Sequence, residues 1–112
     1  MLLETEEVAP GVTKASLTGR LDIDGAHKID LHFNVLAGSR RALIVDMSAV
    51  SFVASMGLRT LMLGFKAVAS KSGKAVILSP TPEVQDVLVS SGIDALAPIV
   101  FSLPDALAAV GG

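Results

Sequence analysis

The stretch that decides the fold reads Asp46-Met47-Ser48-Ala49-Val50-Ser51-Phe52-Val53-Ala54-Ser55-Met56-Gly57-Leu58. It follows a continuous apolar run over Ala42 to Asp46, which is typical of a strand whose two faces are both covered. After Asp46 the pattern predicts a loop, followed by a short apolar stretch whose side chains pack in the core again. The apolar residues of this stretch are Val50, Phe52 and Val53. The segment therefore reads as a buried strand, a loop and the entry to a helix.

A long helix is predicted over Met56 to Lys71, with Ser55 as its N-cap and Gly57 in its first turn. Apolar residues recur along it with the 3.6-residue helical period, which indicates one core-facing stripe. The residues of this predicted stripe are Leu58, Leu61, Met62, Phe65, Val68 and Ala69.

The opposite side of this helix carries Met56 and Leu63, seven residues apart and nearly superposed after two turns. Arg59 and Lys66 flank them. Apolar residues with a basic rim favour a contact surface for another protein, although single exposed apolar side chains are also ordinary surface. The spacing alone leaves both interpretations open.

Working outward, the sequence predicts one α/β domain over residues 1–112 with a mixed sheet of four to five strands and about four helices. Leu2 to Val8 and Val12 to Thr18 flank Pro10-Gly11, the pattern of an antiparallel hairpin. The other predicted strands are Ala42 to Asp46, Ala75 to Leu78 and Ile99 to Phe101. The predicted helices are Gly25 to Ala37, Met56 to Lys71, Glu83 to Ser91 and Pro104 to Val110.

Polar and glycine residues at the predicted helix ends support these boundaries. Asp24 is expected to cap the first helix, with Asp22 as a polar loop residue. Gly92 and Gly73 are expected to end the two helices before them as glycine C-caps. Ser102, with Asp105 three residues later, resembles a capping box around Pro104.

Composition removes several function classes. The 112 residues are 51% hydrophobic, carry a formal net charge of −2 and include no cysteine. Thiol nucleophiles and thiolate metal sites are therefore absent, and the low charge disfavours a nucleic-acid partner. His27 and His32 lie five residues apart, so they cannot bind a metal from one helix face. We expect a non-enzyme with no metal and no cofactor.

The N-terminal segment carries Glu4, Glu6 and Glu7 where a secretion signal has basic residues and then an apolar stretch. No apolar run reaches the roughly 18 residues of a membrane span. We therefore expect a cytoplasmic protein that does not insert into a membrane.

The Asp46 to Leu58 block resembles the STAS domain family, and within it the bacterial anti-sigma factor antagonists. That family reads Asp-Leu-Ser, a spacer, an aromatic-apolar pair and then Asp-Ser-Ser/Thr-Gly-Leu. The resemblance extends to Leu17-Thr18-Gly19-Arg20-Leu21-Asp22 and to Pro82 through Ile99. Ala54 and Met56 depart from the family pattern, which has an acidic residue and a Ser or Thr at these positions.

The resemblance implies that a partner anti-sigma factor with serine kinase activity phosphorylates Ser55. A helix N-terminus accommodates a phosphate, and Arg59 lies one turn on. The added charge would then repel or block the partner. The expected partner-binding residues are Asp22, Asp24, Ala54, Met56, Gly57, Arg59, Leu63 and Lys66.

Two other hypotheses remain. One is a constitutive scaffold or regulatory subunit of a transporter or signalling complex, which the departures at Ala54 and Met56 favour. The other is a small-ligand or nucleotide binder, for which the sequence contains no phosphate loop. The sequence leaves the oligomeric state open between a monomer and a weak dimer.

Overall fold

A computed structural model describes residues 1–111. A five-stranded sheet has the strand order β1-β2-β3-β4-β5, in which β1 and β2 are antiparallel and the remaining neighbours are parallel. The elements are β1 (Leu2–Ala9), β2 (Val12–Leu21), α1 (Ile23–Ser39), β3 (Ala42–Val53), α2 (Ser55–Ser70), β4 (Lys74–Leu78), α3 (Pro82–Ser91), the 3₁₀ turn η1 (Ile93–Ala95), β5 (Ile99–Val100) and α4 (Leu103–Ala109). The α/β class, the mixed sheet, the hairpin and the four helices are confirmed for the described part of the chain.

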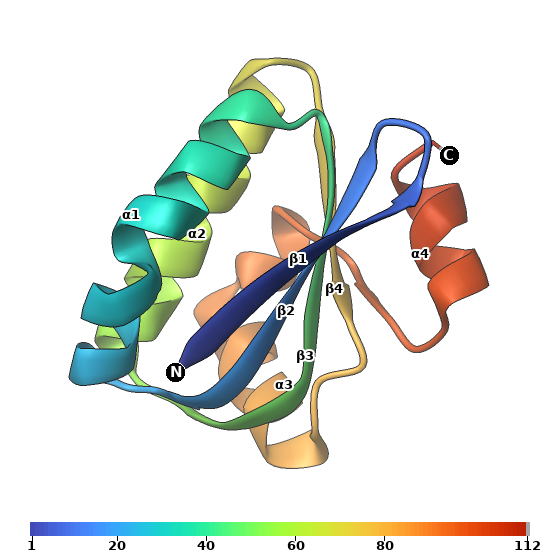
Figure 1. The fold of residues 1–112 in the computed structure, drawn as a ribbon. Coiled ribbons are helices and arrows are strands. Elements are labelled where there is room, and N and C mark those ends of the chain that lie inside the picture. Colours follow the sequence, from blue (N-terminus) through green and yellow to red (C-terminus); the bar gives the residue numbers. More distant parts are fainter. Residues whose placement is uncertain (112) are drawn as a thin grey trace.

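The sheet is covered on both faces, by α1, α2 and α3 on one side and by α4 on the other (Figure 1). Alternation along the central strands produces this arrangement, because successive side chains of a strand point to opposite faces. Leu43 and Val45 of β3 face the three-helix side, whereas Ile44 faces α4. The continuous apolar run in β3 thus contributes side chains to the hydrophobic cores on both faces of the sheet.

The predicted loop after Asp46 is wrong, because β3 continues without interruption to Val53. The register between β2 and β3 shifts twice, once near Ser48 and once near Ser51. Such shifts absorb an extra residue in one strand. Polar residues at the two irregularities made this half of the strand resemble a loop. Phe52 is 40% exposed and does not return to the core.

The N-cap expected at Asp24 is also wrong. Asp22 caps α1, since its Oδ1 accepts a hydrogen bond from the Gly25 N–H at 2.9 Å. Asp24 is the second residue of α1 and lies in its first turn. Ser102 caps α4 as predicted, by accepting from the Asp105 N–H.

Gly92 ends α3 in the left-handed conformation, as expected, with φ of 79°. Gly73 does not end α2 in this way, because the left-handed residue there is Ser72, with φ of 61°. Gly73 is needed for space instead. A Cβ at this position would lie 2.6 Å from the Arg41 carbonyl oxygen.

The buried face of α2 differs from the predicted stripe. Leu61, Phe65 and Val68 are buried as expected, but Ala69 is exposed. The buried face also includes Gly57, Thr60 and Gly64. The buried face of α2 therefore turns toward α1. The small side chains on this face allow the two helices to pack closely. A Cβ on Gly64 would lie 2.3 Å from the Phe33 ring, whose edge packs on Phe65 at 6.3 Å between ring centres.

Within residues 1–111, every helix is too short or too polar to cross a membrane.

Candidate functional site

Two helices begin side by side at the carboxyl edge of the sheet. β2 and β3 are parallel neighbours that end in the paired residues Leu21 and Val53. The Ala54 N–H then donates to the Leu21 carbonyl oxygen at 2.9 Å, just before α2 begins. The carboxyl edge of parallel strands is the usual location of functional residues in α/β sheets. Asp22 at the start of α1 and Ser55 at the start of α2 are therefore brought to the same corner.

Ser55 is the first helical residue of α2 and not its N-cap, which corrects the sequence prediction. The N-cap is Ala54, whose extended backbone places its carbonyl oxygen 3.0 Å from the Leu58 N–H. The Ser55 side chain is exposed. A phosphate on this hydroxyl would lie within the first turn of the helix, where the helix dipole favours negative charge.

The start of α2 differs from the starts of the other α-helices in residues 1–111. Asp22, Thr81 and Ser102 each cap their helix with a side-chain oxygen, whereas Ala54 has no side chain able to do so. The first amide groups of a helix lack intrahelical partners. At α2 they are therefore not satisfied by a side-chain cap.

Asp22 is held in place by its own neighbours. The hydrogen bond from the Gly25 N–H is the largest influence on this carboxyl and lowers its pKa, and Arg20 lowers it further. The Arg20 Nε lies 3.5 Å from Asp22 Oδ2. Its guanidinium also stacks over the Phe52 ring, with Cζ 4.3 Å from the ring centre. Asp22 thus links the cap of α1 to an exposed arginine-aromatic pair.

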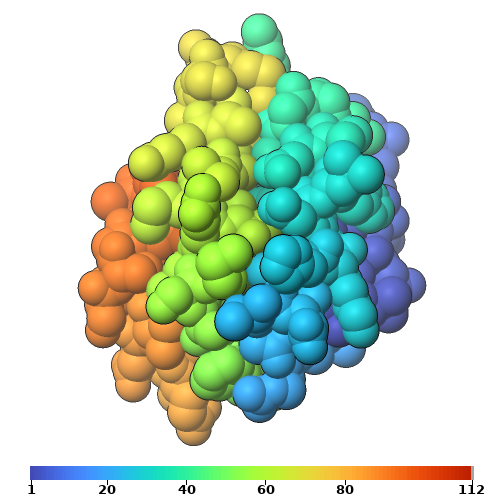
Figure 2. Space-filling view, turned by 90° about the vertical axis from the view of Figure 1, so that its left-hand side faces the viewer, coloured from blue at the N-terminus to red at the C-terminus, as the bar shows by residue number. Residues whose placement is uncertain are grey.

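An apolar groove runs along α2 from Ser55 toward α3. Figure 2 shows this face, with α2 in yellow-green between α1 in cyan and α3 in orange. We call it the α2–α3 groove, and its volume is about 280 Å³. The residues that line it are Ser55, Leu58, Arg59, Met62, Leu63, Lys66 and Ser91. Ser55 and both basic residues thus lie beside the same apolar surface.

The predicted pair Met56 and Leu63 is exposed at 37% and 51%, but the two side chains lie beside different hollows. Leu63 lines the α2–α3 groove, whereas Met56 lines a small hollow next to His27 and Asp30 of α1. The exposed face of α2 thus lies between two separate hollows, one next to α3 and one next to α1. Sequence spacing shows only that both residues share a helix face.

Gly57 is buried and allows α2 to begin at this position. A Cβ on it would lie 2.5 Å from both the Leu21 Cγ and the Leu21 carbonyl oxygen. Its contribution to the site is thus close packing beneath Ser55. Ala54 is half-buried beside it.

Sequence reasoning missed the Arg20–Phe52 pair and the part that α3 plays in the groove. The register of β2 against β3, which sets Arg20 opposite Phe52, depends on two strand irregularities that no local pattern specifies. Asp24, Arg59, Leu63 and Lys66 are exposed, whereas Asp22 is half-buried. Arg59, Leu63 and Lys66 line the α2–α3 groove, but Asp22 and Asp24 do not. No group of three metal-ligating side chains gathers there or elsewhere in residues 1–111.

The comparisons with known proteins agree with this architecture. The STAS domain family model matches residues 5–106. The chain is 28% identical to an anti-sigma factor antagonist from Mycobacterium paratuberculosis, whose crystal structure matches with a TM-score of 0.85 over 99% of this chain and 94% of that chain. It is also 28% identical to a Bordetella bronchiseptica protein named as an anti-sigma factor antagonist, BtrV, over 94% of this chain and 91% of that protein.

A more distant structure shares the fold. The Bacillus cell fate determinant SpoIIAA, in its phosphorylated form, is 19% identical and matches with a TM-score of 0.73 over 96% of this chain and 97% of that chain. The five-stranded mixed sheet and its four helices are thus shared with proteins of the family whose model covers residues 5–106. On this basis, the chain belongs to the STAS domain family.

Proposed function

We propose that this chain is an anti-sigma factor antagonist whose activity is switched by phosphorylation of Ser55. In the unphosphorylated form it binds an anti-sigma factor with serine kinase activity in the cytoplasm, and the sigma factor is released. The kinase transfers the γ-phosphoryl group of ATP to the Ser55 oxygen, and ADP leaves. The chain itself acts as a substrate and binding partner and not as an enzyme.

The observation that carries this proposal is the position of Ser55. It is exposed, it begins α2, and it lines an apolar groove with two basic residues. Phosphorylation adds a charge of about −1.5 to −2 at the edge of that groove. The helix N-terminus and Arg59 favour the phosphate locally, so the fold tolerates the modification while the contact surface changes its charge.

The groove also indicates which partner surface fits it. Leu58, Met62 and Leu63 require an apolar counterpart, while Arg59 and Lys66 at the rim favour carboxylates. We therefore expect the kinase to present apolar side chains flanked by acidic ones. A phosphate on Ser55 would repel those carboxylates, which explains how one modification ends the contact.

A charge placed in the groove tests the contact surface. We expect Leu63→Glu to weaken binding to the cognate anti-sigma factor kinase by about tenfold or more, because the new carboxylate replaces an apolar contact and faces acidic groups of the partner. Binding is measured by calorimetric titration of the kinase with each variant.

Leu31→Glu is the matched control for this variant. Leu31 lies on α1, is 78% exposed and does not line the groove. The Leu31→Glu variant should bind the kinase with wild-type affinity. Wild-type affinity in Leu63→Glu, or an equal loss in both variants, would contradict the assignment of the groove as the contact surface.

A constitutive scaffold is the second candidate function, and the residues beside Ser55 favour it. Ala54 and Met56 depart from the phosphorylation motif of the family, in which an acidic residue and a Ser or Thr take these positions. A scaffold would bind its partner through the same groove without any kinase. This candidate would be supported if Leu63→Glu weakened partner binding while Ser55→Asp bound the partner like the wild type.

A further inference from the structure

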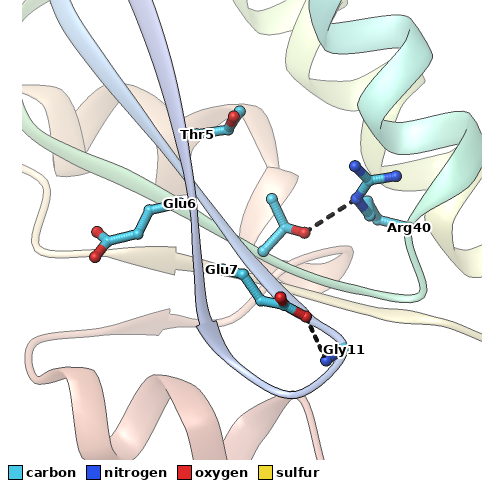
Figure 3. A pocket seen from close by; sticks show the side chains of 6 residues that line it. Thr5, Glu6, Glu7, Gly11 and Arg40 are labelled. Carbon is cyan, nitrogen blue, oxygen red and sulfur yellow. Dashed lines mark hydrogen bonds between the residues drawn. The ribbon is translucent and has the colours of Figure 1, made fainter.

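A second cavity lies at the other end of the sheet, between the β1–β2 hairpin and the end of α1. Its volume is about 280 Å³, just below the roughly 300–1,000 Å³ found for pockets that hold drug-sized ligands, so it suits a smaller molecule. The residues that line it are Thr5, Glu6, Glu7, Gly11, Thr13 and Arg40 (Figure 3). It lies near the first residues of β2, whereas Ser55 lies near the last ones. The two sites are thus separated by roughly 30 Å of strand.

Arg40 is fixed on one wall of this cavity. Its Nε donates to Thr13 Oγ1 at 3.1 Å, and its Nη1 donates to Ser39 Oγ at 3.0 Å. Thr13 is only 8% exposed and is one of two buried polar side chains in residues 1–111. A buried hydroxyl is costly unless it is hydrogen-bonded. Thr13 and Arg40 therefore satisfy each other, and the guanidinium is oriented before any ligand arrives.

Glu7 is fixed on the hairpin side. Its Oε1 accepts a hydrogen bond from the Gly11 N–H at 3.0 Å, across the turn between the strands. The hairpin register shifts between Glu7 and Ala9, and such irregularities redirect the side chains beside them. Glu6 lies on the far side of β1 in Figure 3, where it approaches Lys14 at 4.0 Å. Of the two glutamates that line the cavity, Glu6 thus has a cationic partner in Lys14, whereas Glu7 has no cationic side chain of residues 1–111 within 4.0 Å.

Glu7 and Arg40 line the same cavity but do not neutralise each other. The ion pairs within residues 1–111 are Lys14 with Glu6, Lys14 with Asp46, and Arg20 with Asp22. Arg40 thus has no carboxylate of the described chain within 4.0 Å. Its hydrogen bonds go only to neutral hydroxyl oxygens, so its charge remains available to an anion.

We propose that this cavity binds a small zwitterion, with a carboxylate paired to Arg40 and an ammonium group paired to Glu7. Two opposite charges, each oriented by a hydrogen bond to a neutral group and lining one polar cavity, match a molecule that carries both charges at its ends. The hydroxyls of Thr5 and Thr13 offer further hydrogen bonds within that space. A single anion would leave Glu7 unpaired, and a single cation would leave Arg40 unpaired.

Titration of the ¹⁵N-labelled full chain with glycine, β-alanine and γ-aminobutyrate tests the proposal, since one, two or three methylene groups separate the two charges of these probes. At least one should give saturable amide shifts confined to the residues around the cavity. Arg40→Gln and Glu7→Gln should each weaken that binding by about 10- to 100-fold. Arg41→Gln, a neighbouring exposed arginine that does not line the cavity, should leave it unchanged.

Acetate and ethylammonium, which each carry one of the two charges, complete the experiment. Thermal unfolding of each variant shows whether the fold is intact, and Glu7→Gln and Arg40→Gln change opposite walls. The proposal is overturned by the absence of saturable shifts with all three zwitterions at tens of millimolar. It is equally overturned if acetate binds as tightly as the best zwitterion and Glu7→Gln has no effect.

Discussion

Ser55→Asp should weaken binding to the anti-sigma factor kinase by about tenfold or more, equivalent to about 1.4 kcal/mol. The substitution places a permanent negative charge at the edge of the α2–α3 groove, where Arg59 and Lys66 otherwise favour acidic partner groups. The free energy of unfolding should stay constant or rise by about 0.3–1 kcal/mol, because a carboxylate in the first turn of a helix is favourable. Calorimetric titration and thermal unfolding measure the two quantities.

Ala54→Asp is the matched control, since it adds the same charge one residue earlier. Ala54 has the extended backbone of an N-cap but no side chain to act as one. An aspartate there should cap α2 and stabilise the fold by about 1 kcal/mol. Binding should be retained because Ala54, although the resemblance implies a partner contact for it, is half-buried and does not line the α2–α3 groove. Equal affinities for Ser55→Asp and the wild type, or equal losses in Ser55→Asp and Ala54→Asp, would contradict a specific switch at Ser55.

Gly57→Ala should lower the free energy of unfolding by about 2–3 kcal/mol. Helix propensity alone predicts the opposite sign, because alanine is favoured over glycine inside a helix by about 1 kcal/mol. Here the added Cβ would lie 2.5 Å from the Leu21 carbonyl oxygen, so α2 must move away from the end of β2. Denaturant unfolding at a fixed temperature measures the change.

Gly38→Ala is the comparison that separates packing from propensity. Gly38 also lies inside a helix, but a Cβ on it would have no atom within 4 Å. This variant should be stabilised by about 0.5–1 kcal/mol. A stabilised Gly57→Ala would show that the start of α2 is not packed as closely against β2 as described.

The fold follows from patterns that are local in the sequence. The apolar run at Ala42–Asp46, the Pro10-Gly11 turn and the helical period after Ser55 each specify an element through its own spacing. Helix starts are less well predicted: the sequence favours Asp24 and Ser55 as N-caps, whereas the N-caps of α1 and α2 are Asp22 and Ala54. Two aspartates near the start of α1 are able to cap it and the tertiary backbone selects Asp22, whereas the backbone of α2 makes Ala54 the N-cap although its side chain cannot cap.

The candidate site is less predictable because it depends on contacts between distant segments. Leu63 and Met56 share a helix face in the sequence, but only the packing of α1 and α3 shows that they line separate hollows. Gly57 and Gly64 carry no hydrophobic signal, so the rotation of α2 toward α1 could not be read from apolar spacing. The cavity between Glu7 and Arg40 joins residues 33 positions apart and has no local pattern at all.

In the proposed switch, Ser55 is the phosphate acceptor that controls partner binding. The most direct test of this assignment is the intact mass of the chain after incubation with ATP and the cognate anti-sigma factor kinase, with Ser55→Ala treated in parallel. We expect one added phosphate on the wild type and none on Ser55→Ala. An unmodified wild type, or a phosphate on Ser55→Ala, would contradict this assignment.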